Sequence, residues 1–245
     1  MYQLGLIGKS LTHSFSKKYF DTKFKNEGIK GIQYDLFELE DINLIHQFLL
    51  NTYLKGFNVT IPYKESIIPF LDEIKEEAIA IGAVNCVSLE HGKWIGHNTD
   101  WIGFTNAINP ILNKNHQKAL ILGTGGAAKA VNYALHQLGI QSSYVSRNSN
   151  IGLLYEELNN SSIEEFQIII NCTPIGMYPN IQESPLPDYV KINKDAIVCD
   201  LIYNPIKTKL LEQAENKGAM TLNGMPMLMN QAEESWQIWR GLCAY

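Results

Sequence analysis

A series of short apolar runs in the second half of the chain limits the fold more than any other feature of the sequence. Most of these runs are almost continuously apolar, which is typical of parallel strands that helices cover on both faces. Amphipathic segments separate them, and this alternation predicts βαβ units with a mainly parallel sheet. The predicted strands are KALILG (118–123), SSYVSR (142–147), FQIIINC (166–172), AIVCDL (196–201) and MTLN (220–223).

The first half of the chain alternates in the same way and predicts a smaller α/β layer. Strands are expected at 2–8, 33–39 and 56–61, and a hairpin at 84–97 around His91-Gly92. Apolar residues at helical spacing predict helices over 16–27, 41–51 and 227–240. We therefore expect an α/β protein of two domains, with the C-terminal helix returning to the first. The predicted domains are 1–100 together with 225–245, and 101–224.

Composition and charge exclude several classes of protein. The chain of 245 residues is 45% hydrophobic and 10% aromatic, which is too apolar for a disordered protein. A net charge of −5 without a basic stripe argues against nucleic acid as a partner. Because no apolar segment reaches the length of a membrane span and the start does not resemble a signal peptide, we expect a cytoplasmic protein without membrane contact. The sequence leaves a monomer and a homodimer equally open.

The cysteines and histidines predict neither a disulfide framework nor a metal site. Cys86, Cys172, Cys199 and Cys243 form no CxxC pair and are typical of reduced core residues. The six histidines include no HExxH motif and no pair at i,i+4. We therefore expect no bound metal.

The stretch GTGGAA (123–128) lies between a predicted strand and a predicted helix, which is the context that a dinucleotide-binding fingerprint requires. Gly123 permits the tight turn, Gly125 lets the backbone approach a pyrophosphate, and Ala128 allows the helix to pack closely. Backbone amides at the start of the helix would face the anion. The pattern favours a Rossmann-like domain over a glycine-rich turn of purely structural purpose.

The identity of the dinucleotide depends on the end of the following strand. An acidic residue there accepts the ribose 2′-hydroxyl of NAD, whereas arginine accommodates the 2′-phosphate of NADP. No Asp or Glu occurs between Gly123 and Tyr155, and Arg147 follows Gly123 by 24 residues. The sequence thus favours NADP. The alternative is that Arg147 is an ordinary surface cation, since no further Lys or Arg occurs before Lys191.

Polar side chains of the first half cluster after predicted strands, where open α/β sheets place their ligands. They supply hydroxyl, amide, amine and carboxylate groups, a set suited to a small polyhydroxylated acid. For Ser14, Ser16 and Asp100, helix capping is the alternative explanation. The cluster comprises Ser14, Ser16, Asn58, Thr60, Lys64, Asn85 and Asp100.

Several of these residues belong to stretches that together resemble the shikimate dehydrogenase family, in the family's order and over nearly the whole chain. The stretches are HSFS (13–16), NVTIPYK (58–64), IGAVN (81–85), NTD (98–100), GTGGAAKA (123–130), NCTPIGM (171–177), DLIYNP (200–205) and NGMPML (223–228) with Gln231. The resemblance implies an NADPH-dependent reduction of 3-dehydroshikimate to shikimate, a step of aromatic amino acid biosynthesis, and the reverse oxidation. It also implies that the active site lies in the cleft between the two domains.

The resemblance assigns roles residue by residue. Lys64 and Asp100 would form the catalytic pair, and a positioned ammonium suits the negative charge that hydride transfer builds on a carbonyl oxygen. The substrate would contact Ser14 and Ser16 through its carboxylate, and Thr60, Asn85, Asp100, Tyr203 and Gln231 through its ring and hydroxyls. NADP would contact Gly123, Thr124, Gly125, Gly126 and Ala127 through its pyrophosphate, Arg147 through its 2′-phosphate, and Ile202 and Gly224 near the nicotinamide.

The sequence departs from the family pattern at a few positions. Trp101 stands where glycine is common, Cys86 where threonine is common, and SRN (146–148) replaces the usual NRT. Pro226 replaces a common glycine close to the expected nicotinamide site. A short segment after Arg147 predicts a lower affinity for NADP than is usual in the family.

Two other functions stay open at this point. One is a quinate or shikimate dehydrogenase that uses NAD, which would call for an acidic residue near 146–148. The other is a catalytically silent NADP-binding regulatory protein, which would have no need of Lys64 together with Asp100.

Overall fold

The computed structural model describes residues 1–12, 14–158, 163–187 and 190–243. His13 of the HSFS stretch therefore lies outside the described residues. The chain forms two compact units: unit 1 comprises Met1–Thr99 with Ala232–Tyr245, and unit 2 comprises Asp100–Gln231. The chain passes from unit 1 to unit 2 after Thr99 and returns inside the last helix, after Gln231.

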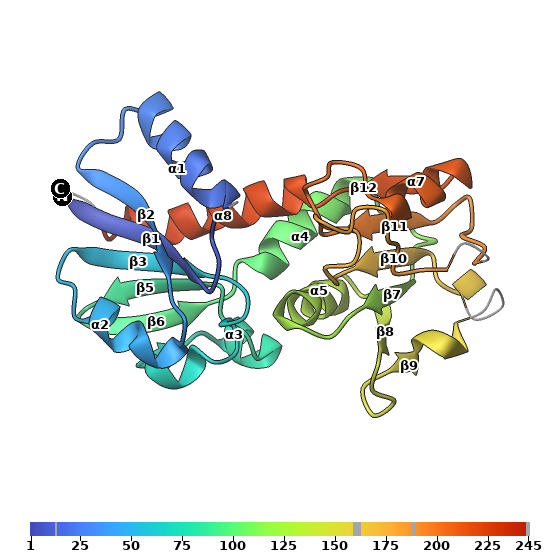
Figure 1. Ribbon diagram of the computed structural model, residues 1–245, viewed down its shortest axis with the longest axis horizontal. Helices are drawn as coiled ribbons and strands as arrows, with labels where there is room; N and C mark the ends of the chain where they lie inside the picture. The colour runs from blue at the N-terminus through green and yellow to red at the C-terminus, as the bar shows by residue number, and fades with distance from the viewer. Residues whose placement is uncertain (13, 159–162, 188–189, 244–245) are drawn as a thin grey trace. The chain divides into compact units, whose positions relative to one another are not determined.

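Unit 1 is built on a sheet of order β2-β1-β3-β5-β6-β4 (Figure 1). β1 pairs in parallel with β2 and β3, whereas β5 is antiparallel to both β3 and β6. The predicted hairpin is confirmed: β5 and β6 are joined by His91 and Gly92, which both have positive φ. The strands are β1 (Tyr2–Gly8), β2 (Ile32–Glu38), β3 (Leu54–Val59), β4 (Glu73–Ile74), β5 (Cys86–Glu90) and β6 (Lys93–His97).

Helices cover both faces of this sheet. The expected single helix over 41–51 is instead a 3-10 turn followed by α2, because Asp41 accepts a hydrogen bond from the Asn43 amide and so starts the tighter turn. The sequence did not predict α3 or the 3-10 turn η2 that precedes it. The helices are α1 (Phe15–Asn26), η1 (Ile42–Leu44), α2 (Ile45–Leu49), η2 (Ile68–Phe70), α3 (Glu76–Ile81) and the part of α8 (Met225–Arg240) that begins at Ala232.

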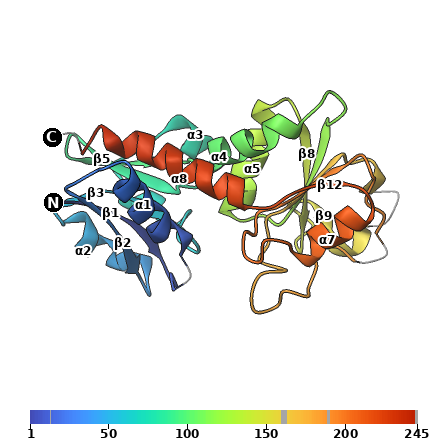
Figure 2. The same ribbon diagram turned by 90° about the horizontal axis from the view of Figure 1, so that it is seen from above.

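The C-terminal helix packs on unit 1, as predicted. Figure 2 shows α8 running beside α1, and Glu233 accepts hydrogen bonds from Tyr19 and Lys23 of α1. Trp239 is fully buried, and its Nε1 donates to the Val87 carbonyl at 2.9 Å. A Cβ at Gly56 would collide with the Trp239 indole, so this glycine lets the helix approach the sheet.

Unit 2 contains a wholly parallel sheet of order β12-β11-β10-β7-β8-β9. All residues of β10 and β11 are buried, which confirms the prediction from their continuous apolar runs. The strands are β7 (Lys118–Leu122), β8 (Gln141–Ser146), β9 (Leu153–Leu154), β10 (Ile168–Asn171), β11 (Ile197–Asp200) and β12 (Met220–Leu222).

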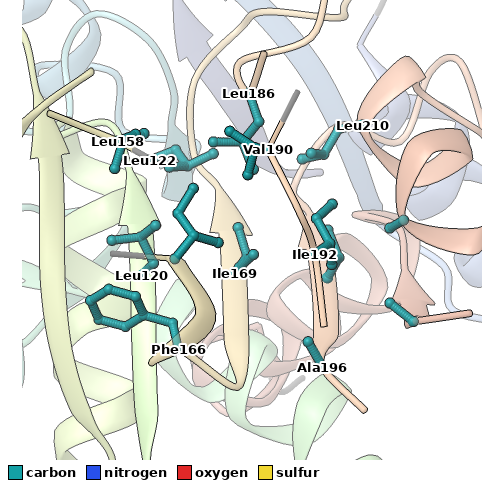
Figure 3. Packing of buried hydrophobic residues seen from close by; sticks show 14 of the residues in the cluster. Leu120, Leu122, Leu158, Phe166, Ile169, Leu186, Val190, Ile192, Ala196 and Leu210 are labelled. Carbon is teal, nitrogen blue, oxygen red and sulfur yellow. The ribbon is translucent and has the colours of Figure 1, made fainter. Parts of the chain in front are cut away.

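Apolar clusters on the two faces of the unit 2 sheet form its core. One contains Leu120 of β7, Ile169 of β10 and Leu210 of α7 (Figure 3). The other includes Phe104 of α4 and Val131 of α5. The helices are α4 (Asp100–Ile108), η3 (Asn109–Ile111), α5 (Gly126–Gln137), η4 (Tyr155–Glu157), α7 (Lys209–Asn216) and the start of α8.

None of the helices within the described ranges is both long enough and apolar enough to cross a membrane.

Candidate functional site

The ends of β1 and β3 bring the first predicted site residues together in unit 1. The strands are parallel with Ile7 opposite Val59, so the segments that follow them leave from the same edge of the sheet. The Thr60 amide donates to the Ile7 carbonyl at 2.9 Å. A Cβ at Gly8 would lie 2.6 Å from the Thr60 methyl group, so glycine is required for this close approach.

Backbone hydrogen bonds place Lys64 beside the segment that contains Asn85. The Lys64 carbonyl accepts from the Val84 amide at 2.7 Å, and the Asn85 carbonyl accepts from the Val59 amide at 2.9 Å. Asn85 is therefore held beside the segment that carries Thr60 and Lys64, although more than 20 residues separate Asn85 from Lys64 in the sequence.

Ser14 carries an unpaired polar group. It occupies the N-cap position of α1, but its side chain makes no capping hydrogen bond. Its Oγ is buried and has no hydrogen-bond partner among the described residues. Helix capping therefore does not explain Ser14, and a buried hydroxyl without a partner is a candidate ligand-binding group.

Ser16 lies inside α1 and is 8% exposed, so it is not a capping residue either. Its hydroxyl hydrogen-bonds the phenol of Tyr34, a fully buried residue of β2 whose pKa is raised well above its usual value, mainly by burial. The phenol is therefore neutral and donates its single proton to Asn58 Oδ1 at 2.9 Å.

The Asn85 side chain is 2% exposed and binds the residue that precedes Asp100. Its Oδ1 accepts from the Thr99 amide at 2.6 Å, and its Nδ2 donates to Thr99 Oγ1 at 3.0 Å. Asp100 is the first residue of α4, where a carboxylate also stabilises the helix N-terminus.

The glycine-rich turn of unit 2 has the backbone that a dinucleotide requires. Gly123 has φ +101°, a conformation that favours glycine, and its amide donates to the Val145 carbonyl at 3.0 Å. Gly125 precedes α5 and is exposed, and a Cβ there would meet nothing within 4 Å. Thr124, Gly126 and Ala127 are partly exposed beside this open space.

The chemistry of this turn suits an anion. The first turn of α5 contains no acidic side chain, so its backbone amides present an uncompensated positive end. Ala128 is fully buried, which agrees with the helix-packing role predicted for it. The residues present therefore fit a pyrophosphate.

Arg147 lies at the same sheet edge as the turn. It directly follows β8, which pairs with β7 so that Val145 is opposite Leu122. Arg147 is exposed. The Asn148 amide donates to Ser146 Oγ at 3.0 Å, and this hydrogen bond shapes the loop that carries Arg147. An exposed guanidinium here is available to a phosphate group.

Ile202, Tyr203 and Gly224 form the other part of the predicted unit 2 site. The Gly224 amide donates to the Ile202 carbonyl at 3.1 Å, and a Cβ at Gly224 would collide with the Leu201 carbonyl. Tyr203 is half-buried, and burial raises the pKa of its phenol. Gln231 belongs to unit 2 as well, where its Nε2 donates to the Leu228 carbonyl at 3.0 Å.

Sequence reasoning missed a buried carboxylate at the end of β11. Asp200 is 1% exposed and accepts hydrogen bonds from Asn171 Nδ2 (3.0 Å), the Ile202 amide (3.0 Å) and Thr208 Oγ1 (2.6 Å). Burial raises the pKa of Asp200, while these donors act in the opposite direction. Asp200 thereby anchors the segment that carries Ile202 and Tyr203. An acidic residue directly after an apolar run was the available signal.

Known proteins with similar sequences identify the family of the chain. A model of the shikimate dehydrogenase substrate binding domain matches residues 6–87. The chain is 40% identical to the shikimate dehydrogenase (NADP(+)) of Methanococcus maripaludis, in an alignment covering 97% of this chain and 91% of the relative. The chain belongs to the shikimate dehydrogenase family. The family model includes Ser14, Ser16, Thr60, Lys64 and Asn85 within its matched range.

Solved structures of shikimate dehydrogenases share the fold over almost the full length. That from Peptoclostridium difficile is 36% identical with a TM-score of 0.83, covering 98% of this chain and 92% of that chain. That from Thermus thermophilus, in complex with NADP(H) and shikimate, is 28% identical with a TM-score of 0.87, covering 98% and 94%.

The structure accommodates one departure from the shikimate dehydrogenase pattern fully and another only in part. Pro226 is the second residue of α8, where the missing amide would have no partner within the helix. Trp101 lies in the first turn of α4 and packs edge-on against Tyr133 of α5, with ring centroids 5.3 Å apart, but its buried Nε1 has no hydrogen-bond partner among the described residues.

Within the parts of the chain that the structure describes, no three His, Cys, Asp or Glu side chains form a group able to hold a metal ion.

Proposed function

We propose that the protein catalyses the reversible NADPH-dependent reduction of 3-dehydroshikimate to shikimate. Family membership supports this reaction, and one structural observation supports the assignment of its substrate-binding groups to particular residues. Ser14, Ser16, Thr60, Lys64 and Asn85 belong to adjacent segments of unit 1, at and beside the ends of β1 and β3. They supply the hydroxyl, amide and amine groups that a hydroxylated ring acid needs.

The substrate carboxylate binds the two serines. Ser14 Oγ is buried without a partner among the described residues, and a carboxylate oxygen would accept its proton. Thr60 and Asn85 bind the ring hydroxyls. Family membership supports substrate binding by Tyr203 and Gln231 as well.

Lys64 is the proton donor of the reduction. Charge develops on the carbonyl oxygen as the hydride arrives at carbon, and an ammonium group within hydrogen-bond reach stabilises that charge and then protonates the oxygen. In the reverse direction the neutral amine takes the hydroxyl proton. Asp100, the second member of the proposed catalytic pair, supplies a carboxylate at the start of α4.

When bound, NADPH supplies the hydride. Gly123 to Ala127 would hold its pyrophosphate through backbone amides, and Arg147 would pair with its 2′-phosphate. Ile202 and Gly224 would contact its nicotinamide. The enzyme acts on small molecules in the cytoplasm, as a monomer or a homodimer.

Initial rates test this function. Shikimate and quinate are each assayed with NADP and with NAD at the absorbance band of the reduced nicotinamide. The proposal expects the highest kcat/KM for shikimate with NADP. A preference for NAD would instead support the alternative function, a quinate or shikimate dehydrogenase that uses NAD. Cofactor binding without turnover of either acid would support the regulatory protein.

A further inference from the structure

Unit 1 contains a buried polar network to which the proposed chemistry gives no role. Asn58 and Ser235 are its centre, and they are 4% and 0% exposed. Asn58 Nδ2 donates to Ser235 Oγ at 2.8 Å and to the Asn85 carbonyl at 3.1 Å, while its Oδ1 accepts from Tyr34 at 2.9 Å. Both amide protons and the carbonyl oxygen of Asn58 therefore have partners, which fixes the orientation of the side chain.

The network continues to the residue before the predicted catalytic aspartate. Ser235 Oγ and Thr99 Oγ1 hydrogen-bond each other at 3.2 Å. Thr99 is 1% exposed and is held a second time by the Asn85 side chain. Thr99 is thus fixed from two sides before the chain continues into α4 at Asp100.

The hydroxyl groups of Thr99 and Ser235 lie close in sequence to the two points where the chain passes from one unit to the other. Thr99 is the last residue of unit 1 before the first crossing, and Ser235 follows the second crossing by one helical turn. Gln231 precedes Ser235 by four residues, so the two share a face of α8. The Thr99 to Ser235 hydrogen bond therefore joins the chain segments that carry Asp100 and Gln231.

We propose that Asn58 and Ser235 are positioning residues that hold Asn85 and Thr99, and through the chain Asp100, in the arrangement that hydride transfer requires. This inference rests on the proposed function. Neither residue contacts the substrate, and each acts through residues that do. Small displacements of a reacting group lower the rate steeply, by up to about 100-fold for 1 Å.

An ordinary stabilising contact affects only the stability of the protein, whereas this network should also affect kcat. Its loss shifts Asn85 and Asp100 but leaves Ser14 and the glycine-rich turn in place. We therefore expect kcat to fall by about 10- to 100-fold while KM for NADP stays within about 2-fold. A purely structural role would lower the stability and leave kcat unchanged.

The test compares Ser235→Ala with Ser88→Ala in the full chain. Ser88 is a matched control because it is also fully buried in unit 1 and hydrogen-bonded, to Glu90 and His97, at a place outside the network. Midpoints of thermal unfolding and kcat and KM for shikimate and NADP are measured for both. We expect similar losses of stability but a fall in kcat only for Ser235→Ala.

A second variant, Thr99→Val, removes the hydroxyl at nearly constant shape. Because it breaks the same link, its effect on kcat and that of Ser235→Ala should be less than additive in the double variant, whereas Ser235→Ala and Ser88→Ala should be additive. Ser235→Thr restores a hydroxyl and should recover most of the lost kcat.

The outcomes separate the inference from the function on which it rests. If the wild-type protein turns over shikimate with NADP but Ser235→Ala keeps kcat within 2-fold of the Ser88→Ala value, roughly the scatter expected for unrelated sites, the positioning role is wrong and the proposed function stands. If the wild-type protein has no such activity, the proposed function is wrong and the positioning role is overturned with it.

Discussion

The two units place their functional groups by different means. In unit 1, side chains that are distant in sequence hold one another through buried hydrogen bonds, as Asn58, Asn85 and Thr99 do. In unit 2, the predicted cofactor residues are placed by backbone geometry: the positive φ of Gly123, the open space at Gly125 and the close approach at Gly224. A hydroxylated acid is recognised by directed side-chain groups, whereas a pyrophosphate is recognised by a row of amides.

This difference makes distinct demands on substitutions. A change to a side chain in unit 1 should alter catalysis or substrate binding, and a change to a glycine or to Arg147 in unit 2 should alter cofactor binding.

Replacing the predicted proton donor should have the largest effect. Lys64→Ala is expected to lower kcat by about 10² to 10⁴ with little change in KM, as for the loss of a positioned general acid. Steady-state kinetics with shikimate and NADP measure both constants. The variant Lys18→Ala, which removes an exposed lysine side chain, serves as a control. An unchanged kcat for Lys64→Ala would reject the assigned role.

Acid should destabilise unit 1 through His97. Burial lowers the pKa of this imidazole from 6.5 to about 4; Lys75 acts in the same direction and Glu90 opposes it. Because the folded pKa lies below the unfolded value, the stabilisation is complete above pH 6.5 and is lost as the pH falls towards 4. The free energy of unfolding should drop by about 3 kcal/mol from this group over that window.

Denaturant titrations across this pH window would show the loss. In His97→Gln the stability is lower at neutral pH, but its decline between pH 6.5 and 4 should be shallower than in the wild-type protein. Parallel pH dependences for the two proteins would contradict the assignment to His97.

Arg147 should determine the choice of cofactor. Arg147→Gln removes the charged partner of the 2′-phosphate, and we expect KM for NADP to rise by about 10- to 100-fold, the range of a charge-assisted hydrogen bond. KM for NAD and KM for shikimate should change little. An equal rise in KM for NADP and NAD would show that Arg147 does not distinguish them.

The smallest effect on stability is expected at Gly125. A methyl group there meets no protein atom within 4 Å, and the φ of −75° suits alanine. Gly125→Ala should therefore change the free energy of unfolding by less than about 1 kcal/mol, yet raise KM for NADP because the methyl group enters the space of the pyrophosphate. In unit 1, Gly8→Ala should instead be destabilising, since its Cβ would press on Thr60 and Leu11. Thermal unfolding of the two variants compares them directly.

The same contrast explains how much could be predicted from the sequence. The turn at Gly123 to Ala128 is local: strand, turn and helix adjoin in the chain, so the motif was readable and the structure has the expected backbone. The parallel strands of unit 2 were readable from continuous apolar runs. In unit 1 the residues Ser14, Lys64 and Asn85 were predicted, but nothing in their spacing revealed which partners hold them.

The missed features have physical reasons. The link from Asn58 to Ser235 spans 177 positions, and no periodicity marks such a pair. Helix α7 has a capping residue, Thr208, and buries Leu210, Leu211 and Ala214. It is only 8 residues long, so its apolar residues repeat too few times to give a clear helical periodicity in the sequence. The sequence does not predict the role of Asp200 in the DLIYNP stretch, because the burial of this carboxylate arises only when the strands assemble.

Ligand binding by paired variants tests the central claim most directly, that the polar side chains of unit 1 bind the carboxylate of the hydroxylated acid and that the glycine-rich turn and Arg147 of unit 2 bind the dinucleotide. Calorimetric titrations of shikimate and of NADP would be carried out separately on the wild-type protein, Ser14→Ala and Arg147→Gln. We predict that Ser14→Ala weakens only shikimate binding and that Arg147→Gln weakens only NADP binding. A wild-type protein that binds neither ligand, or a substitution that weakens both equally, would contradict this division of roles.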